Sequence, residues 1–172
     1  MSNKGVNVGH IRISGIIDES IVDGDGIRAV IFAQGCAHNC HGCQNPETHD
    51  FNGGVLMTYN DILKKLPEPY EIDGITLSGG DPLYQAKDFL GLVKILKEKY
   101  GNIWLYTGFV WEDVMKGSNE DMKQLLLSVD IVVDGKYDES KRSITSTRPC
   151  GSENQRIIDV EMSKIFNEVS YK

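Results

Sequence analysis

Alternating strand-like and helix-like segments restrict the fold of this chain more than any other feature of its sequence. Apolar residues at helical spacing run from Phe89 to Tyr100, where Gly101 supplies a stop, and again from Met122 to Val129. Short apolar runs typical of strands lie around these segments, at residues 11–17, 29–33, 72–77, 103–106, 131–133 and 156–160. Strands that alternate with helices indicate βα units and an α/β fold with a parallel sheet.

Capping residues indicate where two helices begin. Thr58 precedes Asp61 by three residues, which predicts a helix start with Thr58 as the N-cap. Asp81 followed by Pro82 is a favourable N-cap and first-turn pair for the next helix.

The number of βα units sets the shape of the sheet. The 172 residues suit one domain, 1–172. They hold about five βα units, whereas a closed eight-stranded barrel needs roughly 250 residues. We therefore expect an open, partial (β/α) barrel. In such sheets the site lies at the carboxyl ends of the strands, where this sequence places Gly-containing or polar loops.

Three of the four cysteines lie close together and form a C-x3-C-x2-C pattern, Cys36, Cys40 and Cys43. Three thiolates can hold three corners of a [4Fe–4S] cluster and leave one iron open to another ligand, and backbone N–H groups in so short a loop can point at the sulfides. A structural Cys3His zinc site with His38 or His41 is an alternative, although the spacing favours the cluster. Cys150 could be a fourth ligand, which would close the site and make the protein an electron carrier. We prefer the interpretation that Cys150 is a small, buried apolar side chain without a ligand role.

Charge and hydropathy exclude several function classes. Lys and Arg number 18 against 25 Asp and Glu, so the net charge of −7 argues against a nucleic-acid partner. No apolar run approaches the roughly 18 to 20 residues that span a bilayer. The first fifteen residues lack the apolar core of a signal peptide, which predicts a cytoplasmic protein without a membrane partner.

Several motifs around the cysteines resemble those of a known family. V-D-G-D-G-I-R at residues 22–28, then Gly35, the cysteines and Asn45-Pro46-Glu47 are similar to the radical S-adenosylmethionine (SAM) enzymes that activate glycyl-radical enzymes. Further segments resemble one branch, the activases of anaerobic ribonucleoside-triphosphate reductase. These segments lie at residues 45–54, 77–83, 104–108, 133–136 and 154–159. The matching segments cover nearly the whole chain in order.

The resemblance implies a radical SAM fold and an oxidoreductase of the [formate-C-acetyltransferase]-activating type. Its cofactors are a [4Fe–4S] cluster and SAM, and its reaction is reductive SAM cleavage that generates a glycyl radical on the catalytic subunit of the reductase. Reduced flavodoxin or a similar donor supplies the electron. No side chain acts as a catalytic acid or base, because the cofactors carry the chemistry. Another glycyl-radical enzyme, such as pyruvate formate-lyase, is the alternative partner.

The same resemblance assigns site residues. The cluster ligands are Cys36, Cys40 and Cys43, and the SAM contacts are Gly42, Gln44, Asn45, Ser78, Gly79, Gly80, Asp81, Asp134 and Lys136. Asp81 would accept from the SAM ammonium, or act as a helix cap, or do both. For Asp134 and Lys136 the alternative is a solvated turn.

Other residues near the predicted site receive no definite role. The segment Asn154-Gln155-Arg156 has two interpretations, a contact with SAM or a contact with the partner, and the sequence does not choose between them. Tyr106, Phe109 and Trp111 could form a partner surface, although core packing is more common for such residues. No ligand role is assigned to any histidine, His10, His38, His41 or His49.

Overall fold

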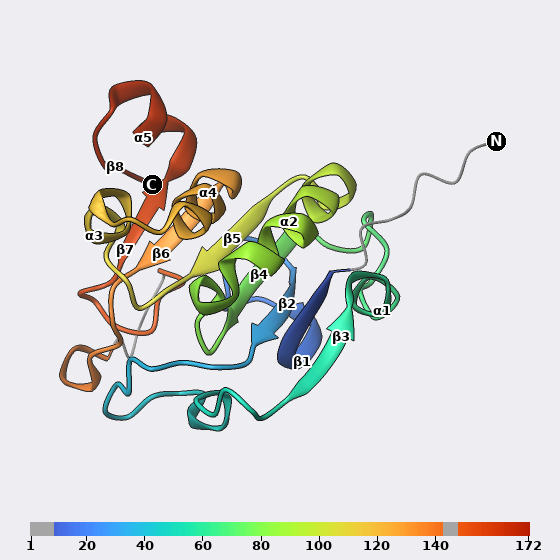
Figure 1. Ribbon diagram of the computed structural model, residues 1–172. Coiled ribbons are helices and arrows are strands. Elements are labelled where there is room, and N and C mark those ends of the chain that lie inside the picture. Colours follow the sequence, from blue (N-terminus) through green and yellow to red (C-terminus); the bar gives the residue numbers. More distant parts are fainter. Residues whose placement is uncertain (1–8, 143–147) are drawn as a thin grey trace.

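The computed structural model describes residues 9–142 and 148–172 and is organised around one eight-stranded mixed sheet (Figure 1). The strands lie in the order β3-β1-β2-β4-β5-β6-β7-β8. Their bounds are β1 His10–Ser20, β2 Arg28–Ala33, β3 Val55–Thr58, β4 Gly74–Gly79, β5 Ile103–Tyr106, β6 Ile131–Asp134, β7 Arg156–Asp159 and β8 Ser170–Tyr171.

The centre of the sheet is parallel, as expected. β2, β4, β5 and β6 pair in parallel, whereas β1 and β3 on one side and β7 and β8 on the other pair antiparallel. The sheet ends at β3 and β8, and no pairing between these two strands closes it within the described residues. The open α/β architecture is thus confirmed.

The last predicted strand runs in the opposite direction to the one expected for a βα unit. Residues 156–159 do form a strand, β7, but it runs antiparallel to β6. A parallel return needs a crossover, usually a helix. The described part of the connection from β6 to β7 holds only the 3-10 turn η3 (Glu139–Lys141), so the chain turns back beside β6. The expected count of about five parallel units therefore falls to four parallel strands.

Helices cover one face of the sheet. They are α1 (Tyr59–Leu63), α2 (Ala86–Tyr100), α3 (Trp111–Lys116), α4 (Glu120–Ser128) and α5 (Val160–Phe166), with 3-10 turns η1 (Pro46–Thr48) and η2 (Pro82–Gln85). In Figure 1, α2 and α4 lie side by side in front of the central strands. Phe89, Leu92 and Leu96 of α2 are fully buried in the main core with Leu77 and Leu105 of the sheet. The helical spacing noted in the sequence is this buried stripe.

The other face of the sheet carries a smaller core around Trp104, which packs with residues of β6 and β7. Arg28 is 1% exposed, lies 5.4 Å from the centroid of the Trp104 ring and donates from Nε to Thr76 Oγ1 at 2.8 Å. A buried guanidinium needs such partners, because an unpaired charge is costly to remove from water. Burial lowers the pKa of Arg28 to about 10. The arginine of the V-D-G-D-G-I-R motif is thus part of the framework of this face.

Both predicted caps are present. Thr58 accepts from the Asp61 amide at the start of α1, and Asp81 accepts from the Leu83 amide at the start of η2, which leads directly into α2. Among the described residues, no helix is both long and apolar enough to cross a membrane.

Candidate functional site

Four loops meet where the parallel strands end. The cysteine loop follows β2, Gly79-Gly80-Asp81 ends and follows β4, Thr107-Gly108 follows β5, and Asp134-Gly135-Lys136 ends and follows β6. Parallel strands bring their carboxyl ends to one edge, so these loops surround a common space. A cavity of about 610 Å³ lies there, and its lining includes Cys36, Cys40, Cys43, Gln44, Asn45, Ser78, Gly79 and Gly80.

All three cysteine side chains line this cavity and are half-buried. The backbone N–H of Asn45 donates to the Cys43 sulfur at 3.4 Å. Burial raises the pKa of the Cys36 thiol. One amide donor therefore does point at a sulfur of this loop.

The donor set fits an iron–sulfur cluster better than a single zinc ion. Within residues 9–142 and 148–172, no three His, Cys, Asp or Glu side chains converge closely enough for one metal ion. A zinc site needs four ligands around a single point, whereas each cysteine of a cluster binds a different iron atom. His38 and His41 also turn to other partners, Asp81 and Glu139. Three thiols spread around one cavity match the cluster.

Asp81 is completely buried and both of its carboxylate oxygens are engaged. Oδ1 accepts from the Leu83 amide, and Oδ2 accepts from Thr107 Oγ1 at 2.8 Å and from the Gly108 amide at 3.0 Å. His38 Nε2 lies 2.7 Å from the same Oδ2. The predicted cap is therefore present. The SAM contact of Asp81 stays a prediction.

The last residue of β4 must be glycine, because neighbouring backbone leaves no room for a side chain. Gly79 has a φ of +96°, and a Cβ there would lie 2.7 Å from the backbone nitrogen and oxygen of Ala33. This close approach holds β4 against the end of β2, where the cysteine loop begins. Gly79 and Gly80 also line the cavity, so a ligand there meets main chain without side chains.

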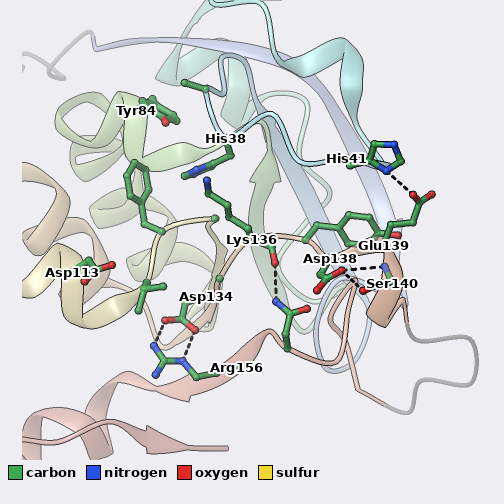
Figure 2. Close-up of a pocket in the computed structure, with 17 residues that line it drawn as sticks. His38, His41, Tyr84, Asp113, Asp134, Lys136, Asp138, Glu139, Ser140 and Arg156 are labelled. Carbon is green, nitrogen blue, oxygen red and sulfur yellow. Dashed lines mark hydrogen bonds and ion pairs between the residues drawn. The ribbon is translucent and has the colours of Figure 1, made fainter.

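A second cavity, of about 1070 Å³, lies beside the first between the cysteine loop and the loop after β6 (Figure 2). Its lining includes His41, Asp134 and Lys136. Two residues, His38 and Gly108, line both cavities. His41 is exposed and lies 2.7 Å from Glu139 across the mouth of this cavity. The two cavities together extend along the whole carboxyl edge of the parallel strands.

Asp134 is held by an ion pair and does not form a solvated turn. Its carboxylate is 1% exposed and accepts from Arg156 Nε and from the Trp111 amide, both at 2.8 Å. Arg156 also donates through both terminal nitrogens to Glu112 of α3. These hydrogen bonds lower the pKa of Glu112 and raise that of Arg156. The alternative of a solvated turn is wrong for Asp134.

The Asn154-Gln155-Arg156 segment fastens the loop after β6. Asn154 donates to the Lys136 carbonyl at 2.9 Å, Gln155 donates to the Gly135 carbonyl at 2.9 Å, and Arg156 binds Asp134. Each residue of one triplet thus contacts one residue of the other. The order of contacts follows from the antiparallel pairing of β6 and β7.

Cys150 is half-buried and packs against the small core around Trp104. It also lines the cavity that holds the three-cysteine loop. Tyr106 donates to the neighbouring Pro149 carbonyl at 2.5 Å, and burial raises the Tyr106 pKa. Trp111 is 7% exposed in the main core, so core packing is confirmed for it.

Sequence reasoning missed the partners of His38, Thr107 and Arg156. His38 and Asp81 are 43 residues apart, and Arg156 and Asp134 are 22 residues apart. No periodic pattern marks such a pair. For His38 and Thr107 the available signal was position alone, because each follows a parallel strand at its carboxyl end. Arg156 begins the antiparallel strand β7 and carried no such signal.

Comparison with known proteins places these motifs in a family. Residues 22–158 match the family model described as a 4Fe-4S single cluster domain. The anaerobic ribonucleoside-triphosphate reductase-activating protein of Enterobacteria phage T4 is 37% identical over 143 residues, which are 79% of this chain and 86% of that protein. The protein of the same name from Haemophilus influenzae is 31% identical over 68% of this chain and 78% of its own length.

A second group of relatives matches over a shorter stretch. The pyruvate formate-lyase-activating enzyme of Clostridium pasteurianum is 41% identical over 93 residues, which are 51% of this chain and 39% of that enzyme. The match to the reductase-activating proteins therefore covers most of this chain, whereas the match to the formate-lyase-activating enzyme covers about half of it.

Proposed function

The chain belongs to the anaerobic ribonucleoside-triphosphate reductase-activating proteins, and we propose that it generates the glycyl radical on that reductase. The three thiols around one cavity, at the carboxyl ends of four parallel strands, carry this proposal. The match to relatives over most of the chain supports the partner. When bound at this edge, a [4Fe–4S] cluster and SAM supply reductive cleavage and the hydrogen abstraction that follows.

The protein's own contribution is to bind, orient and shield. Cys36, Cys40 and Cys43 hold the cluster, and the amide of Asn45 donates to the Cys43 sulfur. Ser78, Gly79 and Gly80 present main chain to the ligand, with Gln44 and Asn45 at the loop side and Asp134 and Lys136 at the far end. Gly42 lies in the same loop but lines neither cavity, and its contact with SAM stays a prediction. These assignments are part of the proposal, and none of the residues acts as an acid or base.

The expected electron donor is reduced flavodoxin or a similar protein, and the expected location is the cytoplasm. The net charge of −7 supports a protein partner over nucleic acid. The open sheet leaves the carboxyl edge accessible, which suits a substrate glycine that belongs to another protein.

An anaerobic assay tests the function. The reconstituted protein is incubated with SAM, a reductant and the reductase, and electron paramagnetic resonance detects the glycyl radical. We expect a radical signal that depends on SAM and disappears in a Cys40→Ala variant. An intact cluster that cleaves SAM but gives no signal on the reductase would refute the proposed partner.

Activation of pyruvate formate-lyase is the second candidate. The 41% identity to the Clostridium pasteurianum enzyme over 93 residues favours it, and it corresponds to the [formate-C-acetyltransferase]-activating class. The same assay with formate-lyase in place of the reductase separates the two. A signal only on formate-lyase would transfer the proposal to this class.

A further inference from the structure

The acidic residue of the Gly79-Gly80-Asp81 motif lies outside the cavity that its neighbours line. Ser78, Gly79 and Gly80 line the same cavity as the three cysteines, whereas Asp81 lines neither of the two cavities described above. The Asp81 side chain is also completely buried. Its carboxylate therefore meets groups of the protein itself, and those groups indicate its role.

Asp81 joins three stretches of the chain through its two carboxylate oxygens. Oδ1 accepts at 3.0 Å from the Leu83 amide at the start of η2. Oδ2 accepts from Thr107 Oγ1 at 2.8 Å and from the Gly108 amide at 3.0 Å, both just after β5. The same Oδ2 lies 2.7 Å from His38 Nε2 in the cysteine loop. One buried carboxylate thus ties the cysteine loop to the ends of β4 and β5.

Packing fixes the His38 ring beside this carboxylate. The His38 side chain is 8% exposed, although the three cysteines of the same loop are only half-buried. Its ring lies edge-on to Phe109 with centroids 4.6 Å apart, and the Tyr84 ring, labelled near it in Figure 2, is 5.6 Å away. A Cβ at Gly108 would lie 2.5 Å from the imidazole, so a larger residue there would push the ring away from Asp81.

The cysteine loop has a second long-range contact, but that contact lies at the surface. His41 Nδ1 is 2.7 Å from Glu139, and the two side chains are 95% and 50% exposed. Exposed pairs hold weakly, because water replaces either partner, whereas a hydrogen bond to a buried carboxylate has no such competitor. Cys40 lies between His38 and His41 in the chain, so the position of this central thiol depends mainly on the buried contact.

We propose that Asp81 is a positioning residue: its buried carboxylate clamps the cysteine loop, through His38, to the ends of β4 and β5, and it acts without contacting SAM. The main chain of Gly79 and Gly80 lies at the same strand end, so one clamp sets both walls of the cavity. This role rests on the proposed function, because it concerns the cluster and the SAM of that site. It takes the place of the direct SAM contact that the resemblance implies for Asp81.

Four variants and a double variant test the clamp. Asp81→Asn keeps the shape of the side chain but loses one acceptor oxygen, and His38→Phe keeps an aromatic ring but loses the hydrogen bond to Asp81. If the Asn variant does not fold, His38→Phe tests the clamp from its other side. His41→Gln is the matched control in the same loop. Leu96→Ala, fully buried in α2, is the control for a general loss of stability.

The variants are compared with and without the cofactors. The anaerobically reconstituted proteins give the rate of iron release to a chelator and, by calorimetry without a reductant, the dissociation constant for SAM. The apo-proteins give the melting temperature and the rate of amide hydrogen exchange in residues 36–45. Amide exchange reports the mobility of the loop before any cluster is bound.

We expect Asp81→Asn and His38→Phe each to release iron about 10-fold faster and to exchange the loop amides faster. The double variant should release iron no faster than the faster single variant, because both substitutions open the same clamp. SAM affinity should fall equally in the two single variants. His41→Gln should match the parent protein, and Leu96→Ala should melt at a lower temperature but release iron at the parent rate.

A direct SAM contact gives a different result. An Asp81→Asn variant that releases iron at the parent rate but binds SAM about 10-fold more weakly would overturn the clamp. Additive effects of the two substitutions would overturn it too, and so would iron release as fast in Leu96→Ala. A parent protein that binds no iron and sulfide would refute the proposed function, whereas faster loop exchange in the apo-forms of both single variants would still support the clamp.

Discussion

Replacing Arg156 with Met tests how the loop after β6 is held. Asp134 is 1% exposed, and Arg156 binds it through Nε and a terminal nitrogen. The variant keeps the apolar stem of the side chain and removes the charge. Among the described residues, the buried carboxylate of Asp134 would then have one remaining hydrogen-bond donor, the Trp111 amide.

The size of the effect follows from burial. Breaking a fully buried ion pair costs about 3–5 kcal/mol, because an uncompensated charge remains inside. Arg156 is 28% exposed, so solvent screens part of this cost. The Trp111 amide still stabilises the carboxylate. We therefore expect Arg156→Met to lower the free energy of unfolding by about 2–4 kcal/mol, a large part of the roughly 5–15 kcal/mol typical of a domain.

A double-mutant cycle divides this loss between the two carboxylates. Glu112 is 39% exposed, so its coupling to Arg156 should be about 0–1 kcal/mol. Coupling between Arg156 and Asp134, measured with Asp134→Asn, should be several-fold larger. Urea unfolding of the apo-proteins, followed by circular dichroism, gives each value. An Arg156→Met variant within about 0.5 kcal/mol of the parent protein would refute the reasoning about the buried carboxylate.

Three further predictions concern the sheet, the acid range and the fourth cysteine. Gly79→Ala should destabilise the protein by well over about 1 kcal/mol, because its φ is +96° and Ala33 leaves no room; a urea midpoint equal to that of the parent protein would contradict this. Arg156 holds the Glu112 pKa below its ordinary value of 4.5, so the stability it contributes is present above pH 4.5 and is lost as the pH falls through the folded-state pKa. Glu112→Gln should therefore flatten the dependence of unfolding free energy on pH below 4.5, and equal slopes in the two proteins would argue against the pairing. Cys150→Ser should keep the iron and sulfide content of the parent protein, whereas a four-cysteine electron carrier would lose its cluster.

The sequence predicted the elements whose signals are local. The cap formed by Thr58 and Asp61 and the apolar stripe of α2 each depend on residues within one or a few turns, and both are present. The edge that gathers the site was also predictable, because parallel strands must present their carboxyl ends together.

Direction and pairing were harder to predict. The apolar run of β7 has the same character in a parallel and in an antiparallel strand, so its sequence could not give its direction. β3 (Val55–Thr58) is short and has two exposed residues, Val55 and Leu56, which weakens any strand pattern. The partners of His38 and Arg156 are set by which strands become neighbours, and that information lies outside any local window.

The long-range contacts of the cysteine loop bear on the order of translation, folding and cluster insertion. His38 needs Asp81, 43 residues further along the chain, and His41 pairs with Glu139, 98 residues further along. Contacts of such long sequence separation form slowly, because the entropy of closing the intervening chain is lost first. During synthesis the cysteines leave the ribosome well before Asp81 and Glu139, the partners of the loop's two histidines. We therefore expect iron and sulfide to be inserted after translation, into an apo-protein whose sheet has already assembled.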